Sequence, residues 1–423
     1  MIGILKKKKI DVNAILFQCF ESDSFKENIE NCKPNHPIYI KLKSCLKILN
    51  QFPDDRNIGL INLKEKIIPN KKNRYIHIIK KRLIYWNDLK TKDTVLSDYY
   101  DKNTQEAVRL FQKRHGLISD AIIGRSTIEA LNYYKNQRIE QVIANMERWK
   151  WYANEFGNNY LLINIPDYSI VAIKNNDTIQ KQKVVVGRDT RKTPILESKI
   201  SNINLNPNWT VPPTILKEDI YPEAEKNKGV FRKKGLVILN NKNEEINPWD
   251  WKKEDAYKYK YAQNPGRNNS LGLMKINFHN KFSVYLHDTN HRNYFAFNHR
   301  SLSSGCVRLE NPLEMAASIL NDSIKWPLQK IKDTTDINYY YKLQKEKQIV
   351  IDKKNALLLA KNPKLIIEKK ILPKPVLKTI VIKVTEDIFI HQLYWTAWET
   401  NGKLQFREDI YCLDAEIFSK LRY

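Results

Sequence analysis

The spacing of the apolar residues changes near residue 159, and this change constrains the fold more than any other feature. Before it, apolar side chains recur at helical intervals, as at Tyr39, Leu42 and Leu46. After it, short apolar runs such as 160–165 are separated by turn residues, which is typical of strands. A chain of 423 residues also exceeds one ordinary core. The sequence therefore predicts a multidomain α+β protein, helical first and rich in strands later.

The strand-rich part holds a histidine and a cysteine suited to nucleophilic catalysis. His287 lies on an apolar, strand-like run, and Cys306 follows a Ser-Ser-Gly turn nineteen positions later. A thiol reacts as the thiolate, and a nearby imidazole commonly lowers its pKa or accepts its proton. Gly305 lets the backbone turn sharply and aim N–H groups at one point, as an oxyanion hole requires. The alternative is that both residues are core side chains, but the flanking serines and Arg308 are harder to explain by packing.

Several motifs together resemble those of the L,D-transpeptidases, the YkuD-like enzymes that cross-link peptidoglycan. The main motif is His287-Asp288, a spacer, and then Ser303-Ser304-Gly305-Cys306-Val307-Arg308. Many members of that family have His where Ser304 stands, whereas the larger, capped subgroup of Gram-negative envelopes often has Ser. Four further segments resemble the same subgroup: 138–151, 184–194, 206–214 and 264–272. The resemblance extends from about Pro37 to near the C-terminus.

The resemblance implies a domain plan. A mostly-β catalytic domain is expected at 159–337, with an inserted capping subdomain at 212–266. This insertion either covers the cleft as a lid that excludes water, or is a static excursion packed on the sheet. Residues 1–36 stay unassigned. The remaining expected units are scaffold helices at 37–73, a helical domain at 74–133, a linking helix at 138–158 and a C-terminal scaffold segment at 338–423.

The unit at 74–133 shows three short helical patterns and resembles the small helical peptidoglycan-binding domain. Its middle helix is predicted at 104–115, and a tight turn follows at 120–124. Ala121 stands where that family usually has Gly, so a strained turn is expected. The alternative is a purely structural module that binds nothing.

The resemblance also implies a reaction. Cys306 would attack the carbonyl of a donor stem tetrapeptide and release the terminal D-alanine, with His287 as general base and then as proton donor. Backbone N–H groups around Gly305 and Cys306 would hold the oxyanion. A side-chain amine of a second stem would then take the thioester, which gives a 3-3 cross-link. Arg308 would orient the loop or bind a substrate carboxylate, with a structural ion pair as the alternative.

Other residues are expected to line the substrate cleft. Tyr285 lies two positions before His287, so both side chains point to the same face of the strand. Trp209 is expected to wall the cleft near the lid. Ser303 and Ser304 are expected to shape the turn, and either hydroxyl could bond to His287. Asp288 should point away from the cleft, so it is not assigned to a catalytic triad.

Composition narrows the partners. A formal net charge of +25 attracts polyanions, but the lysines are spread along the chain and no nucleic-acid-binding motif appears. The expected partners are peptidoglycan stem peptides, with other cell-wall synthesis proteins possible, and no nucleic acid. No metal or other cofactor is expected, since His291 and His299 lack ligand partners at suitable spacing and no glycine-rich phosphate loop exists. The five cysteines include no Cys-x-x-Cys pair.

The expected location, the cell envelope or periplasm, follows from the function. Residues 1–9 are basic, but 10–20 are too short and polar to span a bilayer, so no clear signal peptide or transmembrane helix is found. A degenerate signal, a late start of the gene model or another export route would reconcile the two.

Two other functions compete with transpeptidation. One is an L,D-carboxypeptidase or cysteine peptidase that uses water as the acceptor on the same scaffold. The other is a catalytically inactive wall-binding protein, against which the intact Cys306, His287 and Arg308 argue.

Overall fold

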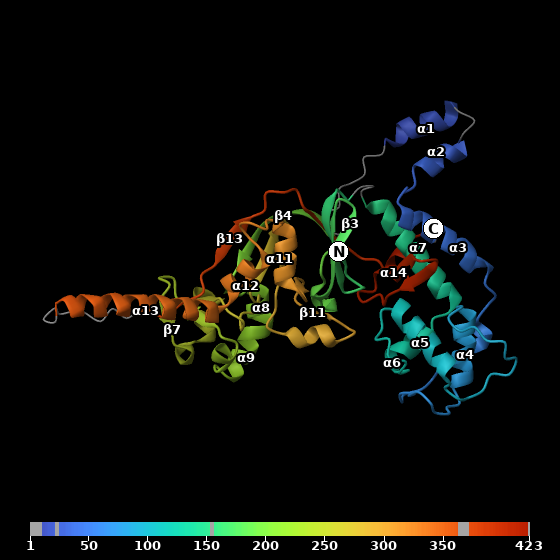
Figure 1. Ribbon diagram of the computed structural model, residues 1–423. Coiled ribbons are helices and arrows are strands. Elements are labelled where there is room, and N and C mark those ends of the chain that lie inside the picture. The colour runs from blue at the N-terminus through green and yellow to red at the C-terminus, as the bar shows by residue number, and fades with distance from the viewer. Residues whose placement is uncertain (1–10, 22–24, 153–155, 363–371, 422–423) are drawn as a thin grey trace.

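The computed structural model describes residues 11–21, 25–152, 156–362 and 372–421. A helical part and a strand-rich part lie side by side in Figure 1, and the last helix of the chain, α14 (Leu413–Lys420), returns to pack against α7 (Lys135–Trp151) of the helical part. The predicted α+β class is therefore confirmed. The basic stretch 1–9 lies outside the described residues.

The helical part begins the chain. In α3, Pro37 occupies the first turn, where a missing N–H costs nothing, and His36 Nδ1 accepts a hydrogen bond from the Ile38 N–H at 3.2 Å. The side chains of Tyr39 and Leu42 are buried, as the helical spacing predicts. The helices are α1 (Val12–Glu21), α2 (Phe25–Asn31), α3 (Pro37–Gln51), α4 (Ile76–Tyr85), α5 (Lys102–Arg114), α6 (Arg125–Leu131) and α7, with a 3-10 turn η1 (Arg56–Ile58).

Helices α4, α5 and α6 surround a core of their own, which includes Leu83, Val108 and Phe111. Asp101 caps α5 by accepting a hydrogen bond from the Thr104 N–H at 2.8 Å. The turn after α5 is strained as expected, because Ala121 has a φ of 62°. Side chains of the surrounding core hold this turn: Gln112 Oε1 accepts from the Ala121 N–H, and the Tyr100 hydroxyl donates to the Ala121 carbonyl.

The strand-rich part is built on one large sheet with the order β11-β3-β12-β10-β9-β4-β14-β1-β2, and β13 pairs with β4. Because β2 also pairs with β3, the sheet closes on itself. Its strands are β1 (Asn159–Asn164), β2 (Ser169–Lys174), β3 (Asp177–Gly187), β4 (Leu196–Leu205), β9 (Met274–Phe278), β10 (Leu286–His287), β11 (Ser301–Ser303), β12 (Val307–Leu309), β13 (Ile380–Lys383) and β14 (Phe389–Leu393).

The C-terminal region takes part in both halves of the molecule. Strand β14 pairs in parallel with β1 and antiparallel with β4, so it lies inside the large sheet. The hairpin of β15 (Ala397–Thr400) and β16 (Lys403–Phe406) contacts helices α3, α7 and α5 instead. The end of the chain therefore ties the helical part to the sheet.

Residues 209–263, which contain most of the predicted insertion at 212–266, form a unit with a hydrophobic core of its own, in which Phe231, Trp251 and Tyr261 are buried. Its small sheet has the order β5-β8-β6-β7. We call this unit the cap. Its elements are β5 (Trp209–Thr210), α8 (Pro213–Ile215), a π-helical turn η3 (Leu216–Ile220), α9 (Tyr221–Lys226), α10 (Val230–Lys233), β6 (Val237–Leu239), β7 (Glu245–Ile246), two 3-10 turns η4 (Pro248–Asp250) and η5 (Lys253–Lys258), and β8 (Lys260–Gln263).

Three helices follow the large sheet. Helix α11 (Pro312–Leu320) packs on β3 and β9 and on α12 (Leu328–Thr335), whereas α13 (Ile337–Lys361) extends away from the domain and buries no side chain. Two further 3-10 turns are η2 (Asp189–Arg191) and η6 (Arg292–Ala296). No helix in the described part of the chain is long and apolar enough to cross a membrane.

Candidate active site

The sheet brings the predicted nucleophile and base together. Strands β10 and β12 are parallel neighbours, and His287 pairs with Arg308 in their register. The Val307 N–H donates to the Tyr285 carbonyl at 3.1 Å, so Cys306, one residue before β12, lies beside the start of β10. The intervening loop, which includes η6, folds back as the sequence predicted.

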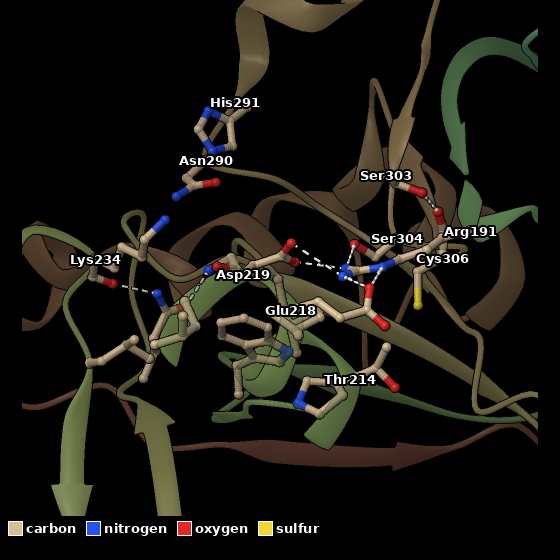
Figure 2. Close-up of a pocket in the computed structure, with 18 of the residues that line it drawn as sticks. Arg191, Thr214, Glu218, Asp219, Lys234, Asn290, His291, Ser303, Ser304 and Cys306 are labelled. Carbon is tan, nitrogen blue, oxygen red and sulfur yellow. Dashed lines mark hydrogen bonds and ion pairs between the residues drawn. The ribbon is translucent and has the colours of Figure 1, made fainter. Parts of the chain in front are cut away.

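A cavity of about 1390 Å³ opens between the cap and the large sheet. Figure 2 shows the Cys306 sulfur at one side of the view and Lys234 of the cap at the other, with Glu218 of the cap between them. Seven of the predicted site residues line it: Cys306, His287, Arg308, Tyr285, Ser303, Ser304 and Trp209. Gly305, the remaining one, lies in the turn behind Cys306.

The His287 imidazole is uncharged at neutral pH. Its side chain is buried, and burial together with the positive charges of Arg308 and Lys275 lowers its pKa to about 3. Its Nδ1 has no hydrogen-bond partner among the described residues. The ring meets the Tyr285 ring edge to face, with 5.5 Å between centroids. A neutral imidazole in this position is able to accept a proton.

The Cys306 thiol is also uncharged at rest. Burial raises the pKa of this thiol, although hydrogen bonding to Tyr285 and the charges of Lys275 and Arg308 oppose the rise. No hydrogen bond joins the thiol to the imidazole in the part of the chain that the structure describes. Of the two routes the sequence left open, a lowered thiol pKa or proton acceptance by His287, the electrostatics favour proton acceptance.

The turn before Cys306 is fixed by hydroxyl groups. Gly305 has a φ of 110°, which a residue with a side chain rarely adopts. The Ser303 hydroxyl donates to the Cys306 carbonyl at 2.5 Å and accepts from the Gly305 N–H at 3.1 Å. The Gly305 N–H is therefore occupied, while the Cys306 N–H has no partner among the described residues. Ser303 shapes the turn as predicted, and neither Ser303 nor Ser304 bonds to His287 there.

A hydrogen-bond chain from the C-terminal region supports this turn, and sequence reasoning missed it. The Thr193 hydroxyl donates to the Gly305 carbonyl at 2.9 Å. The Tyr411 hydroxyl accepts from the Thr193 N–H at 3.1 Å and donates to the Gly187 carbonyl at 2.6 Å. Tyr394 then links the Tyr411 backbone to a carboxylate of the same region. The segment 184–194 was part of the resemblance, but nothing in the sequence connected it to residue 411.

Arg308 presents a positive charge to the cavity. Its guanidinium donates to the Thr289 hydroxyl at 3.3 Å and lies 5.7 Å from the centre of the Tyr294 ring. Among the described residues it pairs with no carboxylate, and its buried Nε has no partner. The structural ion pair considered from the sequence is therefore not formed there, and an anionic group of a substrate would find a free donor.

Asp288 points away from the cavity, as the strand alternation predicted. Its carboxylate accepts hydrogen bonds from the Leu273 N–H and from Arg292, each at 2.9 Å. Burial raises its pKa. This carboxylate secures the loop after β10 and does not contact His287 through its side chain in the described structure.

Two aromatic residues shape the cavity walls. Tyr285 contacts both the core of the large sheet and the core of the cap, and the Lys275 ammonium lies 3.8 Å from the centre of its ring. Trp209, at the base of the cap, belongs to the core of the cap and lines the cavity, as expected. Within the described ranges, no group of three or more His, Cys, Asp or Glu side chains could hold a metal ion.

Two parts of the chain are similar to known protein families. Residues 158–351 match the family model of the YkuD L,D-transpeptidase catalytic domain, and 75–131 match that of the "putative peptidoglycan binding domain". A Haemophilus influenzae protein named "Putative L,D-transpeptidase" is 29% identical over 301 residues, which cover 69% of this chain and 53% of that protein. The chain thus spans about half the length of this relative. Residues 158–351 therefore resemble the YkuD L,D-transpeptidase catalytic domain, and residues 75–131 resemble the putative peptidoglycan-binding domain.

Solved structures of L,D-transpeptidases are also found, at low overall similarity. The enzyme from Stackebrandtia nassauensis has a TM-score of 0.24 and 15% identity, with 59% of this chain and 86% of that chain covered. The one from Xylanimonas cellulosilytica has a TM-score of 0.21 and 12% identity, with 63% and 96% covered. The Ldtfm–avibactam carbamoyl enzyme has a TM-score of 0.21 and 11% identity, with 36% and 41% covered.

Proposed function

We propose that this protein forms 3-3 cross-links in peptidoglycan through a thioester on Cys306. The observation that carries the proposal is that one capped cavity is lined by Cys306, a neutral His287 and Arg308, whose guanidinium pairs with no carboxylate among the described residues. Ligand pockets for single small molecules usually measure about 300–1,000 Å³. A cavity of about 1390 Å³ has room for a donor and an acceptor stem peptide together.

In the first half-reaction, His287 accepts the thiol proton as the Cys306 sulfur attacks the carbonyl carbon of the donor stem. Proton transfer is needed at that moment because the thiol is uncharged at rest. The tetrahedral intermediate then collapses. The bond to the terminal D-alanine breaks, its nitrogen takes the proton from His287, and the donor acyl group stays on sulfur as a thioester.

In the second half-reaction, a side-chain amine of another stem attacks the thioester. His287 accepts the amine proton and returns it to the sulfur as the new amide forms, so the free thiol is regenerated. The Cys306 N–H is the available oxyanion donor in the turn. Loss of one such donor typically costs about 3 kcal/mol of transition-state stabilisation.

The cap influences whether an amine or water attacks the thioester. A covered site holds less water, so amine attack is favoured over hydrolysis while the cap stays down. L,D-carboxypeptidase activity is the competing proposal, and it would dominate if water reached the thioester readily. The peptidoglycan-binding domain would hold the protein on its polymeric substrate, which places its action in the cell envelope or periplasm during wall building and remodelling.

Mass spectrometry of purified sacculi incubated with the protein tests the proposal. Cross-linked dimers are the expected product, and they should be absent with the Cys306→Ala protein. If trimmed tripeptides are the sole product, the function is hydrolysis and not transfer. Unchanged sacculi, together with no carbapenem adduct on Cys306, would contradict both and leave a wall-binding role.

A further inference from the structure

One arginine of the catalytic domain contacts both the cap and the turn that carries the nucleophile. Arg191 ends the short turn η2, directly after β3, and its side chain is only 8% exposed. Its guanidinium donates to the Ser304 hydroxyl at 2.9 Å. The same group donates to Asp219 at 2.7 Å and to Glu218 at 2.5 Å, and both acids belong to the cap (Figure 2).

These contacts are the main charged link across the cavity. Among the described residues, every ion pair between the cap and the rest of the protein involves Arg191 or its neighbour Arg188, which lies 3.4 Å from Asp219. Other charged pairs of the cap, such as Lys253 with Glu225, are internal to it. The two acids sit in the π-helical turn η3, and such turns are frequent at functional sites.

The backbone around Arg191 is joined to the nucleophile turn as well. The Arg188 N–H donates to the Ser303 carbonyl at 3.0 Å, next to Ser304. Strand β3, which leads into η2, pairs with β11, which leads into the turn. Arg191 is therefore held on the same framework as Ser304. Its planar guanidinium binds three acceptors at once in a fixed geometry, which the compact ammonium of a lysine does not reproduce.

We propose that Arg191 is a positioning residue that couples docking of the cap to the shape of the turn carrying Cys306. When the cap acids hold the guanidinium, it lies where the Ser304 hydroxyl can accept its hydrogen bond. When the cap lifts, that hydrogen bond loses its fixed donor, and the turn two residues before the nucleophile relaxes. Catalytic geometry is thus complete only while the site is covered.

Hydrogen exchange followed by mass spectrometry tests the coupling without any substrate. Because coupling between two sites is reciprocal, Ser304→Ala, a change in the turn, should speed exchange in the cap segment 213–226. We expect at least about a threefold increase, since a hydrogen bond to a charged group contributes roughly tenfold or more to an equilibrium. Ser301→Ala is the matched control. Ser301 lies in β11, three positions before Ser304, and its hydroxyl contacts His299 instead of Arg191.

Arg191→Met completes the cycle. It should speed cap exchange by itself, and adding Ser304→Ala to it should have no further effect. Cap exchange that is unchanged in Arg191→Met would overturn the docking role. Faster exchange in Arg191→Met but not in Ser304→Ala would leave a simple cap contact and overturn the coupling. Unchanged exchange in α5, far from the cap, confirms that each variant is folded.

A kinetic measurement extends the test, and only this part rests on the proposed function. Arg191→Met should lower kcat by about tenfold or more with KM within about twofold, because a small misplacement of the nucleophile slows the chemical step. Arg191→Lys keeps the charge but not the fork, so it should restore kcat only in part. Lys253→Met, which breaks an ion pair inside the cap, should leave both constants unchanged. An equal effect of Lys253→Met would show that any loosening of the cap suffices.

Discussion

The ionisation state of the Cys306 thiol gives the sharpest prediction about chemistry. The ordinary pKa of a cysteine thiol is 9.0, and burial raises the pKa of the Cys306 thiol above it. A thiol with a pKa of 9 or more is less than about 1% thiolate at pH 7. The rate of alkylation by iodoacetamide, which follows the thiolate, should therefore rise about tenfold for each pH unit between 6 and 8.5, without a plateau.

The His287→Ala protein separates proton acceptance from an ion pair. The imidazole has a pKa of about 3 and carries no charge at neutral pH, so its removal should leave the alkylation profile almost unchanged. Acylation by a stem tetrapeptide should nevertheless fall by about 10²–10⁴, which is the usual contribution of a general base. The Cys306 peptide must be followed by mass spectrometry, because the chain has four further cysteines.

Two results would refute this reasoning. A plateau of the alkylation rate below pH 7 in the unchanged protein would indicate a preformed thiolate–imidazolium pair. A shift of the profile to higher pH by one unit or more in His287→Ala would mean that a charged imidazole had been lowering the thiol pKa.

Three further predictions concern stability. His287 should make folding acid-sensitive, because the pKa of its imidazole is about 3 in the folded state and 6.5 when unperturbed. The unfolded state therefore binds more protons between these pH values, and the free energy of unfolding falls as pH drops from 6.5 toward 3. Urea titrations should show a shallower fall in His287→Gln, and parallel curves for the two proteins would contradict the assignment. Tyr411→Phe should lower the free energy of unfolding by about 1–3 kcal/mol in urea titrations, because the Gly187 carbonyl loses its hydroxyl donor. The turnover rate should fall as well, and full activity would show that the turn before Cys306 needs no support from the C-terminal region. Gly272→Ala should destabilise the protein more than Gly402→Ala. Both glycines have a positive φ, but only at Gly272 would a Cβ overlap the Asp288 carboxylate. Equal decreases in the thermal unfolding temperature would mean that this carboxylate moves freely.

The sequence predicted what local patterns and short-range motifs encode. Helical spacing identified α3 and α5, and the run around His287 was placed on a strand. The loop between His287 and Cys306 is short, so their meeting at one cavity could be predicted without knowledge of the whole sheet. The departure at Ala121 was enough to predict a strained turn.

The parts that escaped prediction depend on contacts between distant segments. Strand β14 lies between β4 and β1, more than 180 residues away along the chain, and its own pattern does not name those partners. The support of Gly305 by Thr193 and Tyr411 joins three segments through single hydroxyl groups. Such contacts carry no periodicity, and they become visible only in the folded structure.

The most direct test of the central claim is the mass of the intact protein after brief reaction with a stem tetrapeptide and no acceptor. The account predicts an added mass equal to the stem tripeptide acyl group, located on Cys306 and released by an added amine. The same adduct should form much more slowly in His287→Ala and not at all in Cys306→Ala. An adduct on another residue, or turnover of the peptide by Cys306→Ala, would contradict a thioester mechanism at this site.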